Sequence, residues 1–106
     1  MDETCKVFWR GSEIGTFEIV SFDMMYMDCI WTADDKDEAM MFELLVAKFN
    51  PKEVLQNPAK GTRVRLKYQG SESLIHALVI GFLEGKYFIR QISSYAGVEW
   101  LVNNVI

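Results

Sequence analysis

The sequence contains very little histidine, cysteine or proline. Its 106 residues include one histidine, two cysteines and two prolines. The two cysteines do not form a CxxC pair, and with a single remote histidine they do not complete a four-ligand zinc site. Two thiols in a chain with enough apolar residues for its own core are typical of a reduced, intracellular protein. We therefore predict that Cys5 and Cys29 are free thiols that pack as small hydrophobic residues.

Long apolar runs are also missing. The longest, such as residues 77–80, are far shorter than the roughly 20 residues that a membrane-spanning helix needs. Residues 1–5 are acidic, whereas a secretory signal begins basic and continues apolar. Half of the residues are apolar and a quarter are charged, as in ordinary globular proteins. We expect one cytoplasmic domain spanning residues 1–106, with no membrane partner.

The sequence lacks the common motifs of catalysis and phosphate-loop binding. Its two Gly-Ser pairs, at 11–12 and 70–71, match neither the nucleophile elbow nor the glycine-rich phosphate loops. The acidic cluster at 34–38 lacks the spacing of a calcium loop, and helix capping explains it. His76 lies within an apolar strand, where a structural role is favoured over acid–base chemistry. No catalytic residue, metal ligand or cofactor is predicted.

The charge is unevenly distributed along the chain. The net charge of −4 combines −7 over residues 1–59 with +3 over residues 60–106. The favoured interpretation is that the two halves pack side by side and attract each other, and the alternative is a bipolar surface that orients a charged partner. Arg63, Arg65 and Lys67 form a basic row on one strand face. The overall acidity argues against a nucleic-acid partner, because phosphate binding depends on neutralising many charges.

Hydrophobic periodicity predicts six strands and two helices. The strands are expected near 6–10, 13–22, 29–32, 62–69, 74–83 and 87–92, and the helices near 35–49 and 94–105. The alternation changes phase at Val20, which indicates either a bulge or a change to burial on both faces. The buried helix stripes are predicted to be Met41, Phe42, Leu45, Val46 and Phe49 in the first helix, and Tyr95, Val98, Leu101, Val102 and Val105 in the last. Asp34 or Asp35 is expected to cap the first helix and Ser93 or Ser94 the last.

The two halves of the chain share one order of elements, three strands followed by a helix. This order predicts an α+β fold in which one mostly antiparallel sheet of about six strands carries two helices on one face. It also favours a βββα-βββα internal duplication, with pseudo-repeats at 4–50 and 62–106. Residues 74–83 are apolar on both faces, which is typical of a central strand.

Several large apolar side chains fall where water is expected. The corner at 24–27 gathers methionines beside a tyrosine, and three further residues leave the predicted helix stripes. Methionine, tyrosine and tryptophan are favoured at binding surfaces. The predicted contact residues are Met24, Met25, Tyr26, Met40, Leu44 and Trp100. The alternative is that they complete a second small core or cover a sheet edge.

These features favour a non-catalytic interaction domain that binds a protein partner. The partner is either a second copy, giving a dimer, or a basic protein that the chain masks as an inhibitor or immunity-type protein would. The second hypothesis is a small-ligand-binding protein or enzyme with a pocket between helices and sheet near His76.

Overall fold

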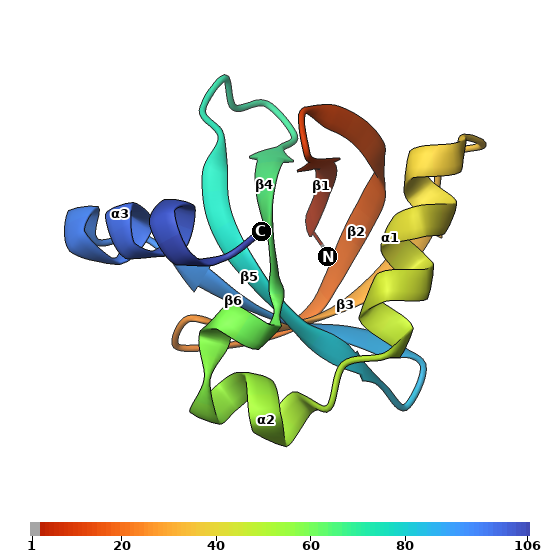
Figure 1. Ribbon diagram of the computed structural model, residues 1–106. Helices are drawn as coiled ribbons and strands as arrows, with labels where there is room; N and C mark the ends of the chain where they lie inside the picture. The colour runs from red at the N-terminus through yellow and green to blue at the C-terminus, as the bar shows by residue number, and fades with distance from the viewer. Residues whose placement is uncertain (1–2) are drawn as a thin grey trace.

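The computed structural model describes residues 3–106, and its six strands close into an antiparallel barrel (Figure 1). Met1 and Asp2, part of the acidic stretch considered above, lie outside the described residues. The strands are β1 (Glu3–Trp9), β2 (Ser12–Asp23), β3 (Tyr26–Ala33), β4 (Thr62–Tyr68), β5 (Ile75–Leu83) and β6 (Lys86–Ile92). The helices are α1 (Asp37–Ala47), α2 (Pro51–Gln56), the short 3₁₀ helix η1 (Pro58–Lys60) and α3 (Tyr95–Asn104).

The six strands, their antiparallel pairing and the two longer helices confirm the sequence-based prediction, but the open sheet is wrong. The order around the barrel is β1-β2-β3-β6-β5-β4, because β1 pairs with β4 and β3 pairs with β6. Closure leaves neither three-stranded half with an unpaired edge, which removes a template for aggregation. The helices do not share a face, since α1 and α3 lie on opposite sides of the barrel (Figure 1). The internal duplication stays a prediction.

Matching irregularities bend the long middle strand of each half. The pairing of β2 with β3 shifts register between Ile19 and Ser21, which agrees with the first of the two alternatives for the phase change at Val20, a bulge. The pairing of β5 with β6 shifts in the same way between Val79 and Gly81. A bulge bends a strand and increases its local twist, and a six-stranded barrel needs strongly curved strands to close.

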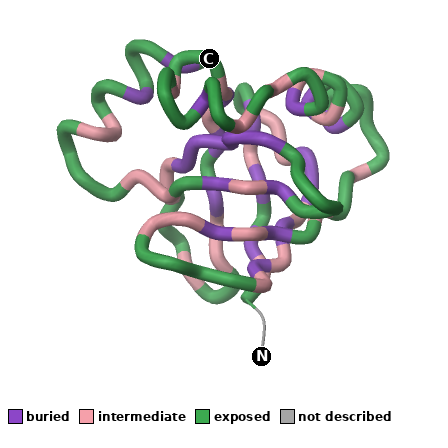
Figure 2. The backbone as a smooth tube through the Cα atoms, turned by 90° about the horizontal axis from the view of Figure 1, so that it is seen from below, coloured by how far each residue is buried: buried purple, intermediate pink, exposed green. Residues whose placement is uncertain are grey.

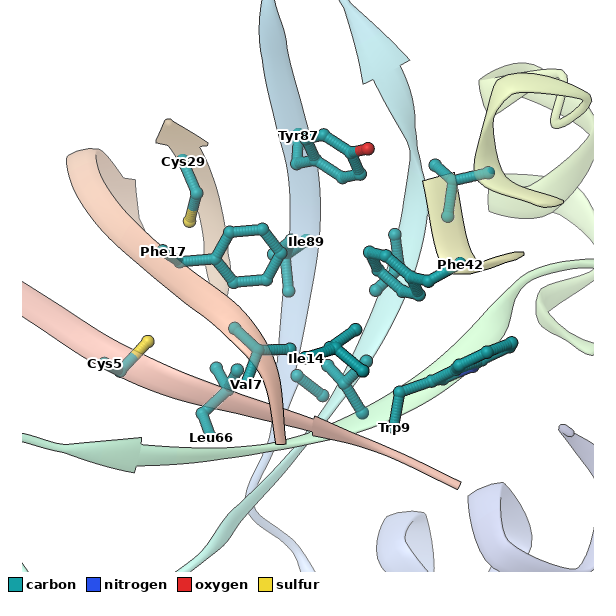
Figure 3. Packing of buried hydrophobic residues seen from close by; sticks show 14 of the residues in the cluster. Cys5, Val7, Trp9, Ile14, Phe17, Cys29, Phe42, Leu66, Tyr87 and Ile89 are labelled. Atoms are coloured by element: carbon teal, nitrogen blue, oxygen red, sulfur yellow. The ribbon is translucent and has the colours of Figure 1, made fainter. Parts of the chain in front are cut away.

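Alternate residues of the strands fill the barrel interior, and α1 adds Phe42 to them. Figure 2 shows buried positions concentrated along the strands, and Figure 3 shows the packing of the interior side chains. The Phe42 ring lies 5.5 Å from Trp9, 5.3 Å from Trp31 and 5.9 Å from Tyr87, measured between centroids. Aromatic pairs at these separations add to the free energy gained from burial alone. This aromatic cluster therefore attaches α1 to the barrel.

A second, smaller core lies on the outer side of β5. Residues 77–81 are all buried, which confirms that β5 has two covered faces. Ala77 and Val79 point into the barrel, whereas Leu78 and Ile80 belong to the outer core. The outer core is completed by Val54 of α2 and by Leu101 and Val105 at the α3 end of the chain.

The helices bury narrower stripes than predicted. α1 buries only Ala39, Phe42 and Val46, and the Met41 side chain is 54% exposed. In α3, Leu101 is buried, whereas Tyr95 is 88% exposed and Val102 is exposed as well. Because the barrel surface curves away from each helix, it buries a narrower strip of the helix than a flat sheet would.

One of the two predicted helix caps is confirmed. The Ser94 hydroxyl accepts a hydrogen bond from the Gly97 amide at 3.0 Å, as expected for an N-cap serine. The cap at Asp34 or Asp35 is wrong. The residue before α1 is Lys36, which makes no side-chain cap bond, and Asp37 and Glu38 lie in the first turn. Their carboxylates suit the positive end of the helix dipole without capping it.

We predict that α1 depends on Phe42 far more than on its neighbour Met41. Phe42→Ala removes the ring that contacts three other aromatic rings and should lower the free energy of unfolding by about 3–5 kcal/mol. Met41→Ala, the matched control, should lower the free energy of unfolding by less than about 1 kcal/mol, because Met41 is largely exposed to water. Urea unfolding followed by circular dichroism measures both. Equal losses in the two variants would contradict this account of how α1 is held.

Cys5 and Cys29 are free and buried, which confirms the sequence-based prediction. They lie on β1 and β3, on either side of β2. Strands two positions apart are separated by roughly 9–10 Å. This exceeds the roughly 7 Å limit for the Cα atoms of a disulfide. Burial raises the pKa of both thiols to about 12.

Both thiols should therefore be unreactive in the folded protein and accessible once it unfolds. At about pH 8 a thiol with a pKa near 12 has a thiolate fraction on the order of 10⁻⁴, and the thiolate is the reacting form. Titration with a chromogenic disulfide reagent, without prior reduction, should detect both thiols in guanidinium. In native buffer, both thiols should react much more slowly than they do in the unfolded chain. Rapid labelling of the folded protein, or fewer than two thiols in the unfolded chain, would be the contrary result.

Candidate functional site

The structure separates the predicted contact residues into two groups on different sides of the barrel. Met40 and Leu44 lie on the outer side of α1, where both side chains are 60% exposed. The remaining four are Met24, Met25 and Tyr26, at the β2–β3 turn, and Trp100 on α3. The orange turn lies on the α3 side of the barrel in Figure 1, away from α1. The six residues therefore do not form one surface.

The second group, which we name the α3 surface, consists of Met24, Met25, Tyr26 and Trp100. Met25 and Trp100 line the same pocket, of about 390 Å³, between β6 and α3. Met24 is 81% exposed at the tip of the turn. Tyr26 instead stacks on Phe88 at 5.4 Å and packs against the outer core. For Tyr26 the structure agrees with the alternative, a residue that completes a second small core.

Met27, which the sequence analysis grouped with this corner, is not on the surface. Its side chain is 1% exposed and lies in the barrel interior. The turn is confined to Met24 and Met25, and strand β3 begins at Tyr26. Because side chains alternate across a strand, Tyr26 points outward and Met27 inward.

The first group belongs to a wider apolar area, which we name the α1 surface. It consists of Met40, Met41 and Leu44 on α1, with Ile30 and Phe82 from neighbouring strands, all of them exposed. Ile30 and Phe82 line a pocket of about 420 Å³ that the helix borders through Glu43 and Ala47. Met40 lies three positions before Glu43 and Leu44 three positions before Ala47, so each neighbours a pocket-lining residue on the helix surface. Sequence reasoning missed Ile30 and Phe82, because apolar residues occur on both sides of their strands.

The α1 surface lies on an acidic segment of the chain. Residues 34–48 contain five carboxylates and two lysines, a net charge of −3. Within the pocket the Glu43 carboxylate accepts a hydrogen bond from Trp31 Nε1 at 3.0 Å. Burial, with the Glu43 charge as a smaller cause, raises the pKa of the Tyr87 hydroxyl to about 12. The α1 surface therefore combines exposed apolar side chains with an acidic segment that places Glu43 in the neighbouring pocket.

A different pocket, of about 500 Å³, contains His76 and lies between the barrel wall and the C-terminal end of α3. We name it the His76 pocket. Strand pairing places Phe8 of β1 opposite Arg65 of β4, and Arg65 opposite His76 of β5. Because neighbours of these residues point into the barrel, all three side chains lie on the outer wall. His76 therefore lines a pocket on the outer wall, and the second hypothesis, a ligand-binding or enzymatic function there, stays a prediction.

The charged side chains that line the His76 pocket are all basic. Arg10, Arg63, Arg65 and His76 line it, and no aspartate or glutamate does so within residues 3–106. Arg63 Nε donates to the Val105 carbonyl at 2.8 Å, which holds the guanidinium in place. Burial first, and then the charges of Arg65 and Arg63, lower the pKa of His76. In the described part of the chain, His76 Nδ1 is buried without a hydrogen-bond partner.

The His76 ring should make stability depend on pH. Because its pKa is lowered in the folded state, the unfolded chain binds more protons as the pH falls through the ordinary value near 6.5. The stability that His76 contributes is thus complete above that value and is lost as the pH falls toward the folded-state pKa.

His76→Gln keeps a neutral polar side chain and cannot gain this charge. The loss of unfolding free energy between about pH 7.5 and about pH 5.5 should therefore be smaller in the variant than in the parent. Urea titrations at the two pH values measure it, and carboxylates titrate equally in both proteins. An identical pH dependence in parent and variant would refute the conclusion that burial and the nearby arginines lower the pKa of His76.

Within residues 3–106 no helix is long and apolar enough to cross a bilayer. No group of three or more histidine, cysteine, aspartate or glutamate side chains in that range is arranged to hold a metal ion. Comparison of the chain with protein-family models, with curated proteins and with solved structures found no match.

Proposed function

We propose that this chain is a non-catalytic protein-binding domain that docks its partner on the α1 surface. The observation that carries the proposal is the outer face of α1, where Met40, Met41 and Leu44 are all exposed. A helix that only covers a core carries polar residues on its outer face. Here the apolar face continues into the Ile30–Phe82 pocket, which offers a partner a concave apolar site.

The α1 surface can supply useful binding energy. Complete burial of one methionine or leucine side chain contributes ~1.5–3 kcal/mol. Met40 and Leu44 are already partly covered, so their contribution lies toward the lower end. Methionine adapts its shape to a partner, and central apolar anchors dominate the energy of most interfaces.

The charges around the surface indicate the chemistry of the partner. The net charge of −3 over residues 34–48 favours a partner with an apolar centre and a basic border. A two-fold dimer through the same surface would bring these carboxylates face to face, which is unfavourable. The proposal therefore commits to a basic protein partner, as for an inhibitor or immunity-type protein.

Leu44→Asp should disrupt this interaction. The substitution places a charge at the centre of the surface and should weaken partner binding at least tenfold, about 1.4 kcal/mol. Leu55→Asp is the matched control, because Leu55 is comparably exposed but lies on α2, outside the surface. The measurement is the dissociation constant for a partner recovered by affinity capture with the parent chain, together with the melting temperature of each variant.

Other outcomes assign the binding differently. Loss of the partner with Trp100→Ala, but not with Leu44→Asp, would move the interaction to the α3 surface. A concentration-dependent mass in sedimentation that Leu44→Asp abolishes would make the partner a second copy. If both aspartate variants stay folded and bind as tightly as the parent, the α1 surface is not the docking site.

A further inference from the structure

The outer wall of the barrel brings together basic residues that are far apart in the sequence. Closure of the barrel sets β4 between β1 and β5, so Phe8, Arg65 and His76 form one row across three strands. Arg63, two residues before Arg65, lies on the same face of β4, and Arg10 follows β1. All five line the His76 pocket.

No aspartate or glutamate within residues 3–106 forms an ion pair with the arginines of this pocket. Lysines make ion pairs elsewhere on the barrel, as Lys67 does with Glu72 at 3.9 Å. In contrast, Arg63 donates to a main-chain carbonyl, and the Arg10 guanidinium lies over the Trp9 ring at 4.2 Å. Three guanidinium groups thus line one pocket in a chain whose net charge is −4.

The side of the pocket formed by α3 is fixed in place. The Thr62 hydroxyl and the Arg63 amide both donate to the Ile106 carbonyl, and Thr62 in turn accepts from Trp9 Nε1 at 2.9 Å. Leu101 and Val105 anchor the same segment in the outer core. The α3 side of the pocket is therefore bounded by anchored groups, which lowers the entropic cost of ordering that side around a ligand.

We propose that the His76 pocket binds the phosphate group of a small phosphate ester, with Arg10, Arg63 and Arg65 as the anion ligands and Phe8 against the ester group. A phosphate monoester carries up to two negative charges and three free oxygens, so it can engage several guanidinium groups at once. A ligand with a single carboxylate carries only one negative charge, so it would leave part of the positive charge of the arginines uncompensated. The volume of about 500 Å³ falls within the usual range for small-molecule sites. This inference does not depend on the protein-binding proposal.

The shape of the site favours a small molecule over a nucleic-acid strand. Polynucleotides bind along basic grooves that follow several phosphates, with aromatic rings for successive bases. Here the basic row is short, because Lys67 is paired with Glu72 and α3 covers the opposite end. Phe8 is the aromatic side chain of this pocket.

Isothermal titration with phenyl phosphate, phenyl sulfate and inorganic phosphate tests the proposal. Phenyl phosphate should bind more tightly than phenyl sulfate, which has the same shape but one negative charge, and more tightly than inorganic phosphate, which lacks the ring. Arg65→Gln should weaken phenyl phosphate binding about tenfold or more, because a hydrogen bond to a charged group is lost. Lys67→Gln is the matched control: it removes the same charge from the same strand, outside the pocket, and should change the affinity less than about twofold.

His76 provides a second readout that needs no substitution, because it is the chain's only histidine. The charged side chains lining the pocket with it are Arg10, Arg63 and Arg65, and Ile106, the last residue of the given sequence, lines it as well. A bound phosphate offsets them and should raise the pKa of His76 toward its ordinary value, which proton NMR follows through the ring resonances. A pKa that does not move at saturating phenyl phosphate would place the ligand elsewhere.

The remaining outcomes each overturn the proposal in a distinguishable way. Equal weakening by Arg65→Gln and Lys67→Gln would show a general charge effect, and equal affinity for sulfate and phosphate esters would show an unselective anion site. Tighter binding of an oligothymidylate, lost in both variants, would make this wall a nucleic-acid surface. No saturable binding of any probe, with all variants folded, would remove the site altogether.

Discussion

The pairing of β1 with β4 and of β3 with β6 holds the two halves of the chain together, and the other features follow from it. Each half supplies three strands and would leave two unpaired edges if it stood alone. The two interhalf pairings satisfy all four edges at once, and the strand bulges at Val20 and Ile80 give the curvature that closure requires. Closure then creates one interior core, into which Phe42 fits, and an outer wall that α2 and α3 must cover.

Much of this fold could be predicted from local patterns. Alternation found the six strands, and the two-sided apolar run at 74–83 identified β5 as covered on both faces. Ser93 or Ser94 was expected to cap the last helix, and Ser94 does. What the patterns could not distinguish was an open sheet from a closed one. Both place the same residues inward, and the difference lies in the long-range partners of β1 and β3. Nothing local to either strand specifies those partners.

The candidate sites also differ in whether local sequence patterns or long-range strand pairing create them. Exposed Met40 and Leu44 were found from helical spacing alone, since a helix stripe is a local property. The His76 pocket depends on three strands that are adjacent only after closure. Sequence analysis therefore identified Arg63, Arg65 and His76 separately, without the geometry that joins them. The overall acidity then obscured the site, because a net charge averages over surfaces that are separate in space. The better guide would have been the charge of each half.

That charge asymmetry now has a structural interpretation. Attraction between the two halves was the favoured explanation. Of the three ion pairs within residues 3–106, however, Lys6–Glu13 lies inside the first half and Lys67–Glu72 inside the second. The third, Lys60–Glu53, joins residues close to the junction between the halves. The hydrogen-bonded strand pairs and the apolar core already hold the halves together. The acidic residues of α1 and the arginines of β4 instead lie on different outer surfaces. The bipolar surface stays a prediction, and with it the expectation that a basic protein and a phosphate group bind at separate places without competing.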